Sequence, residues 1–167
     1  MSFQVGDKVV YPNQGVCAIE EVCDRAIAGR SEQFFMLRIL SNDSTVMVPV
    51  SNVENVGLRQ LCTEEDLRKL CGVLGSEFDE PEQDWKNRYK ENVEKMKTGC
   101  LFEVGQVLQN LYYLSYQKPL SFREKKMYDR ARHLVVSEIA MVRELSAADV
   151  ETFVDELLSR SYQQVMA

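Results

Sequence analysis

The hydrophobic period changes near residue 60, and this change constrains the fold more than any other feature of the chain. Before it, β-branched and aromatic residues form runs at residues 7–12, 15–27, 33–40 and 45–50, separated by turn-forming segments such as "PNQG" and "SNDS". After it, apolar residues recur at spacings of three and four, which is typical of amphipathic helices. The sequence therefore predicts an α+β protein with two domains, residues 1–60 and residues 61–167.

The strand-like runs of the N-terminal part follow one another with no helical pattern between them. Consecutive strands joined by short turns pair in antiparallel fashion. We therefore expect a small, strongly bent antiparallel sheet that forms a partial β-barrel. Gly6, Gly15 and Gly29 lie where tight turns or bulges are expected.

The C-terminal part predicts a compact all-helical domain. Its helices are expected at residues 63–75, 80–99, 100–117, 121–145 and 146–160. Pro81 is expected near the start of the second helix. The fourth begins with "SFRE", in which Ser121 and Glu124 have the spacing of a reciprocal capping box.

Composition argues against several classes of protein. The cysteine count is odd and no C-x-x-C pair is present, which disfavours a disulfide scaffold or a zinc ribbon. His133 is the only histidine, and no phosphate-binding loop or catalytic motif occurs. We predict no enzyme activity, no metal and no cofactor. Because no apolar run of about 18 residues and no apolar signal core are present, we expect no membrane association and a cytoplasmic location.

Charge is uneven along the chain, although the net charge is −6. Residues 76–84 carry five acids and no base, whereas residues 85–97 carry five bases and two acids. The only tryptophan, Trp85, begins this basic segment and is followed by Lys86, Arg88 and Lys90. An exposed aromatic ring flanked by cations suits a DNA groove or a strand junction, because the cations bind phosphates while the ring contacts bases.

Helical spacing puts Trp85, Arg88, Tyr89 and Asn92 on one face of that helix. Tyr89 either contacts DNA or packs inward. The alternative for the whole segment is a partly buried tryptophan among lysines that only contact water. A second basic cluster, which includes Lys125 and Lys126, opens the fourth predicted helix and is either a further phosphate contact or a solvated face.

The opening "FQVGDKVVYPNQGVCAIEEV" resembles that of the CarD/CdnL family of bacterial transcription regulators. The likeness continues through "TVMVPVSNVENVGLR", "DWKNRYKENVEKMKTG" and "LSFREKKMYDRAR", and so spans nearly the whole chain. The resemblance implies a Tudor-like N-terminal domain that binds a lobe of the RNA polymerase β subunit, as in transcription-repair coupling factors. It also implies a helical domain that faces promoter DNA and stabilises the open complex.

The resemblance also implies roles for single residues. Trp85 matches the residue that family members insert at the upstream fork of the melted DNA, and Lys125 matches a phosphate contact. Arg25 matches a polymerase contact, whereas Met47 stands where some relatives carry arginine. Thr45, Val46, Met47, Val48 and Pro49 form the expected polymerase-binding run. We interpret this run as a strand near a sheet edge that pairs with the β subunit, the alternative being an ordinary internal strand.

The sequence thus predicts a monomeric, non-enzymatic regulator of transcription initiation, which binds RNA polymerase and contacts promoter DNA weakly and without sequence specificity. The first alternative is an adaptor that binds polymerase or another protein and has no direct role at DNA, with Trp85 buried. An enzyme of unknown type is a second alternative. A methyl-lysine reader would need an aromatic cage, which Tyr11, Phe34 and Phe35 do not obviously form.

Overall fold

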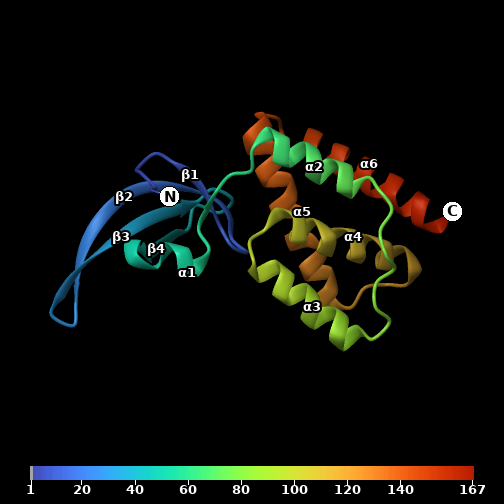
Figure 1. The fold of residues 1–167 in the computed structure, drawn as a ribbon, viewed down its shortest axis with the longest axis horizontal. Helices are drawn as coiled ribbons and strands as arrows, with labels where there is room; N and C mark the ends of the chain where they lie inside the picture. The colour runs from blue at the N-terminus through green and yellow to red at the C-terminus, as the bar shows by residue number, and fades with distance from the viewer. Residues whose placement is uncertain (1) are drawn as a thin grey trace. The chain divides into compact units, whose positions relative to one another are not determined.

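The computed structural model describes residues 2–167 and divides into Met1–Leu61, here called the sheet unit, and Cys62–Ala167, the helical unit (Figure 1). The first holds the strands and the second holds the long helices, so the fold is α+β as predicted. The predicted division between residues 60 and 61 lies one residue before the observed one.

The sheet unit contains five strands: β1 (Lys8–Tyr11), β2 (Gly15–Ile27), β3 (Arg30–Ile39), β4 (Thr45–Pro49) and β5 (Arg59–Gln60). They pair in the order β4-β3-β2-β1-β5, and every pair is antiparallel, which confirms the expectation from the short turns. Within the described residues no ladder joins β4 to β5, so the sheet is open between these two strands. A 3-10 turn (Val50–Asn52) and the short helix α1 (Val53–Val56) connect them, and the sequence pattern did not predict this helix.

The β2–β3 hairpin projects beyond the other strands of the sheet (Figure 1). Ile27 pairs with Arg30, so only Ala28 and Gly29 form the loop. Both have positive φ, 51° and 79°, as the favoured two-residue hairpin turn requires. The inner half of the hairpin packs on the sheet core around Ile19 and Leu37, whereas the outer half is exposed.

The helical unit contains α2 (Glu64–Leu74), α3 (Trp85–Lys97), α4 (Leu101–Gln117), α5 (Phe122–Arg143) and α6 (Ala147–Met166). All five were predicted. The helix α4 contacts each of the other four, and its buried face carries Val104, Leu108 and Leu111 (Figure 1). None of the helices in the described part of the chain combines the length and apolar character that a membrane crossing needs.

The start of α3 differs from the prediction. Pro81 is buried in the connection before the helix, and the helix begins four residues later at Trp85. Asp84 caps it, because an oxygen of its carboxylate accepts a hydrogen bond from the Lys86 backbone N–H at 3.1 Å. Trp85 is therefore the first helical residue rather than a residue of the second turn.

Candidate nucleic-acid and protein interfaces

Trp85 lies on the surface of the helical unit. Trp85 is 54% exposed, whereas the buried residues that form the apolar core of this unit are at most 8% exposed. A large aromatic ring that is this exposed contributes little to the stability of the fold, because most of its apolar area stays in water. Trp85 is thus not a core residue, and its ring is accessible to a binding partner.

Arg88, one helical turn after Trp85, is buried instead, with 4% of its surface exposed. Its Nε and Nη2 donate hydrogen bonds to the two carboxylate oxygens of Glu124, both at 3.0 Å. Its Nη1 donates to the backbone carbonyl of Glu82 at 2.9 Å. The expectation that Arg88 contacts DNA is therefore wrong, because its guanidinium is enclosed and its donors are used within the protein.

Glu124 also departs from its predicted role. The Ser121 hydroxyl accepts a hydrogen bond from the Glu124 backbone N–H at 3.2 Å, as a helix cap should. The Glu124 carboxylate, however, pairs with Arg88 rather than reaching back to the Ser121 backbone. Only half of the predicted capping box forms, whereas Thr63 and Asp66 form a complete one at the start of α2.

The ion pair between Arg88 and Glu124 joins the first turn of α3 to the first turn of α5. The two helix starts lie next to each other at one end of the helical unit (Figure 1). A second contact supports the same arrangement, since the Arg123 guanidinium carbon lies 6.0 Å from the centre of the Tyr89 ring. The two basic clusters, separated by more than 30 residues in sequence, are therefore neighbours in the fold.

Four lysines lie at these helix starts: Lys86 and Lys90 on α3, Lys125 and Lys126 on α5. All four are exposed, and within residues 2–167 none of them lies within ion-pair distance of a carboxylate. Lys126 Nζ lies 5.0 Å from the centre of the Phe122 ring. The ammonium groups are thus available to an anionic partner. We call Trp85, Phe122 and these four lysines the basic-aromatic patch.

The shared face that helical spacing predicted is divided in the structure. Trp85 is exposed, Tyr89 is half-buried and Asn92 is 2% exposed. The face turns inward from Arg88 onward, because α4 packs against α3 and Glu124 of α5 pairs with Arg88. Tyr89 lies at this transition, under Arg123.

Phe122 is a surface residue that the sequence analysis did not single out. It is the first residue of α5 and is 74% exposed, more than any other large apolar residue in the described part of the chain. Its position directly after the Ser121 cap was visible in the sequence. The predictions for "SFREKKM" rested on its capping spacing, its lysines and the family resemblance, and none of these pointed to the Phe122 ring.

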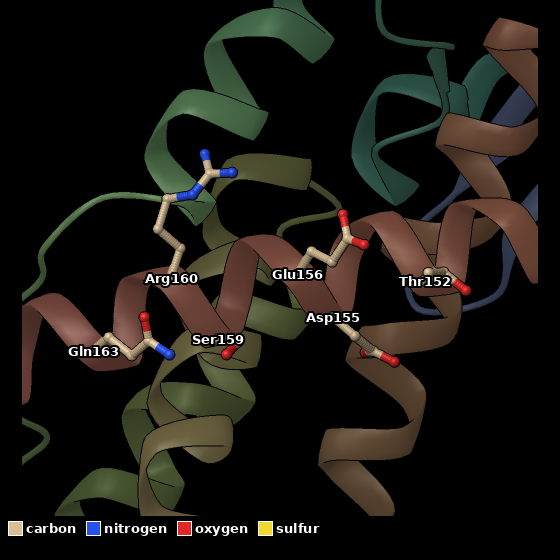
Figure 2. Close-up of a pocket in the computed structure, with 6 residues that line it drawn as sticks. All are labelled: Thr152, Asp155, Glu156, Ser159, Arg160 and Gln163. Atoms are coloured by element: carbon tan, nitrogen blue, oxygen red, sulfur yellow. The ribbon is translucent and has the colours of Figure 1, made fainter.

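Two open grooves lie elsewhere on the helical unit. One runs along α6 with a cavity volume of about 510 Å³ and is lined by Thr152, Asp155, Glu156, Ser159, Arg160 and Gln163. Figure 2 shows that these side chains leave the helix in several directions rather than converging. The other, of about 410 Å³, is lined by carboxylates of the acidic connection and by Glu91. Its five carboxylates outnumber its one lysine, Lys95, so we expect no phosphate contact there.

On the sheet unit, β4 is an edge strand. This confirms the prediction that residues 45–49 form a strand at a sheet edge, and it excludes the alternative of an internal strand. Thr45 and Met47 are exposed, whereas Val46 and Pro49 are half-buried. Val48 is 1% exposed and packs in the sheet core. A contact through its side chain is therefore excluded, and only its backbone remains available at the edge.

Arg25 is exposed on the outer half of the β2–β3 hairpin, directly opposite Glu32 on β3. Ser51, just after β4, donates a hydrogen bond from its hydroxyl to a Glu32 carboxylate oxygen at 3.2 Å. Arg25 and the end of β4 thus lie on either side of Glu32. The structure brings together the two elements that were expected to contact polymerase.

No catalytic centre is apparent in the described part of the chain. Residues 2–167 contain no cluster of three or more histidine, cysteine or acidic side chains that could hold a metal ion. Burial lowers the pKa of His133, and the charge of Arg130 lowers it further, so the imidazole is neutral at pH 7. Burial raises the pKa of the Cys17 thiol to about 11, which disfavours the reactive thiolate.

The described residues thus offer two surfaces suited to a macromolecular partner, the exposed edge of β4 and the basic-aromatic patch. Comparison with known proteins identifies the family. Residues 69–155, more than half of the chain, match the family "CarD, C-terminal domain", and residues 3–62 match the "CarD-like/TRCF RID domain". The chain belongs to the CarD family, which is a family of transcription factors rather than of enzymes.

Two individual proteins illustrate the likeness. The chain is 28% identical over 151 residues to the putative transcription factor YdeB of Bacillus subtilis (strain 168), covering 90% of this chain and 99% of that protein. It is 39% identical to the N-terminal domain of Myxococcus xanthus CarD, a 72-residue fragment whose structure was solved by solution NMR. That match covers 35% of this chain and 79% of the fragment, with a TM-score of 0.31.

Proposed function

We propose that this protein regulates transcription initiation by bridging RNA polymerase and promoter DNA. The sheet unit binds a lobe of the polymerase β subunit, and the basic-aromatic patch contacts DNA at the upstream edge of the melted region. The protein acts as a monomer, and the bridge lengthens the lifetime of the open complex. Membership of the CarD family and the match of residues 3–62 to the RID domain support the polymerase contact.

The exposure of Trp85 among lysines without acidic partners carries the proposal. Lysines that neutralise phosphates release bound counterions, which favours binding to DNA of any sequence. An aromatic ring that stacks on a base contributes roughly 1–3 kcal/mol more. The alternative, an adaptor with no role at DNA, predicts a buried Trp85, whereas Trp85 is exposed. An adaptor would also have no use for the exposed ring or for the lysines around it.

Free DNA is expected to be a poor ligand. The chain carries a net charge of −6, and the acidic connection lies close to the patch in sequence. Once polymerase holds the protein, the effective concentration of DNA at the patch rises, so that a weak contact suffices. The DNA contact is therefore weak, insensitive to sequence and dependent on polymerase.

For the polymerase contact, β4 offers free backbone donors and acceptors along its outer edge. A strand of the β subunit that pairs with this edge gains hydrogen bonds and makes little demand on side chains. The side chains of Thr45 and Met47 are exposed on this strand. Met47 stands where some relatives carry arginine, so it provides an adaptable apolar contact in place of a salt bridge. Arg25 lies on β2, across Glu32 of β3 from the end of β4, and adds a charge that steers association.

The test of the DNA contact is the lifetime of the open complex, measured with purified polymerase and Trp85→Ala. We expect a five- to hundredfold shorter lifetime than with the wild-type protein, with the melting temperature and polymerase binding unchanged. Lys90→Glu should reduce the same activity, since it removes a phosphate contact and adds repulsion. Leu145→Ala removes another exposed apolar side chain of the helical unit and serves as the control. Normal lifetimes with Trp85→Ala would favour the adaptor function.

The polymerase contact is tested separately by the affinity of the full-length protein for the β subunit. Arg25→Glu should weaken binding, because it inverts a charge that lies across β3 from the proposed edge. Arg30→Glu makes the same charge change near the tip of the same hairpin and is the matched control. Equal affinities for these two variants would contradict the assignment of Arg25.

A further inference from the structure

We propose that Phe122 is a second aromatic contact to nucleic acid, so that the interface stacks on bases through two rings rather than one. This inference rests on the proposed function and adds a residue that neither the sequence patterns nor the family match pointed to. It starts from the exposure of Phe122, 74%, which exceeds even the 54% of Trp85. A ring so exposed buries little area on folding, and so folding does not account for it.

The placement of Phe122 mirrors that of Trp85. Each is the first residue of its helix and directly follows the capping residue, Asp84 for α3 and Ser121 for α5. The ion pair that joins these helices connects the first turns themselves, through Arg88 three residues after Trp85 and Glu124 two residues after Phe122. Both rings therefore stand at the same end of the helical unit.

The buried ion pair also fixes this arrangement. Two hydrogen bonds of 3.0 Å hold a planar guanidinium against a planar carboxylate, which sets both distance and orientation. A third, from Arg88 to the Glu82 carbonyl at 2.9 Å, holds the segment that leads into α3. The two rings are thus presented from anchored backbone rather than from a free loop.

The charges around Phe122 indicate nucleic acid as the partner rather than an apolar protein surface. Lys126 Nζ lies 5.0 Å from the ring centre, and Arg123 and Lys125 are exposed beside it. Glu124, the one acid among these neighbours, is neutralised by Arg88. Burying such a ring in a protein interface would also bury the lysines, at a cost in desolvation, whereas a nucleotide offers a base to the ring and a phosphate to the cation.

The experiment compares open-complex lifetimes for wild type, Phe122→Ala, Trp85→Ala and the double variant, each with saturating protein. We expect Phe122→Ala to shorten the lifetime at least fivefold and the double variant to shorten it further than either single change. Phe122→Trp should retain the wild-type lifetime and Phe122→Leu should not, because stacking needs a ring and not only apolar volume. Leu145→Ala again serves as the control.

A photo-crosslinking amino acid at position 122 supplies a readout that does not depend on lifetime. It should crosslink to promoter DNA in the open complex, as should one at position 85, whereas one at position 145 should not. Crosslinking to a polymerase subunit in place of DNA would overturn the inference. So would weaker binding of Phe122→Ala to polymerase in the absence of DNA.

The outcomes separate this inference from the function on which it rests. A shortened lifetime with Trp85→Ala but a normal one with Phe122→Ala leaves the proposed function standing and removes Phe122 from it. Normal lifetimes with both variants contradict the proposed function itself. A thermal melt of Phe122→Ala, expected to match wild type because the ring is exposed, excludes misfolding as the cause of a loss.

Discussion

Replacing Arg88 with methionine tests the buried ion pair that organises the basic-aromatic patch. The side chains of Arg88 and Glu124 are only 5% and 7% exposed, so water does not replace the lost partner. The change removes two hydrogen bonds to Glu124 and one to the Glu82 carbonyl, and it leaves a buried carboxylate unpaired. Breaking a buried pair from one side typically costs about 3–5 kcal/mol.

For a unit of roughly 100 residues, each kcal/mol shifts the melting temperature by about 4 °C or more. We therefore expect Arg88→Met to melt roughly 12 °C or more below wild type. The measurement is a thermal melt of the full-length chain in which circular dichroism reports the loss of helix. Lys86→Met changes an exposed cation on the same helix and should stay within about 0.5 kcal/mol of wild type. Arg88→Met should also shorten the open-complex lifetime, although Arg88 contacts no DNA in our proposal.

The double variant Arg88→Met/Glu124→Leu makes the test sharper. Replacing both charges by apolar groups removes the unpaired carboxylate, so the double variant should be more stable than Arg88→Met alone. A loss below about 1 kcal/mol for Arg88→Met would refute the argument. So would a double variant whose loss equals the sum of the two single losses, because that result would mean the two side chains do not interact.

Three further predictions concern other parts of the chain. Ala28→Asn should stabilise the protein by up to roughly 1 kcal/mol in urea unfolding, because Ala28 in the β2–β3 turn has a φ of 51°, which alanine disfavours and Asn-Gly adopts readily. Equal or lower stability of the variant would contradict this. Because of Cys17, the free energy of unfolding should fall as pH rises from 9 towards 11. The thiol loses its proton at its ordinary pKa of 9.0 in the unfolded chain but only at a pKa of about 11 in the folded protein. Cys17→Ala should lose that part of the pH dependence in the same urea assay. The free protein should bind duplex DNA weakly and without sequence preference, with affinity that falls as salt rises, in fluorescence anisotropy titrations; tight binding to one sequence would instead indicate a conventional repressor.

The sequence by itself determined the types of element and their order. Turn signals between β-branched runs specify an antiparallel sheet, because short turns leave no room for the crossovers that parallel strands need. Capping residues and apolar spacing located the five long helices. The start of α3 was misplaced, because Pro81 and Asp84 both fit a helix start and only the observed cap distinguishes them.

The basic-aromatic patch was only partly predictable. Trp85, Lys86, Lys90, Lys125 and Lys126 were singled out from local charge and from the resemblance, and the structure exposes all of them. Arg88 was grouped with them because it lies one turn from Trp85. Helical period tells which residues share a face, but it does not tell where along the helix a neighbour begins to cover that face.

Only the tertiary structure decided which charges face inward. Glu124 has the spacing of a capping residue, and this local role competes with a partner 36 residues away in sequence. Once α3 packs beside α5, pairing with Arg88 satisfies two buried charges together, which outweighs one local hydrogen bond at the helix start. That packing also brings Trp85 and Phe122 to the same end of the helical unit, a proximity that no sequence pattern of either helix records.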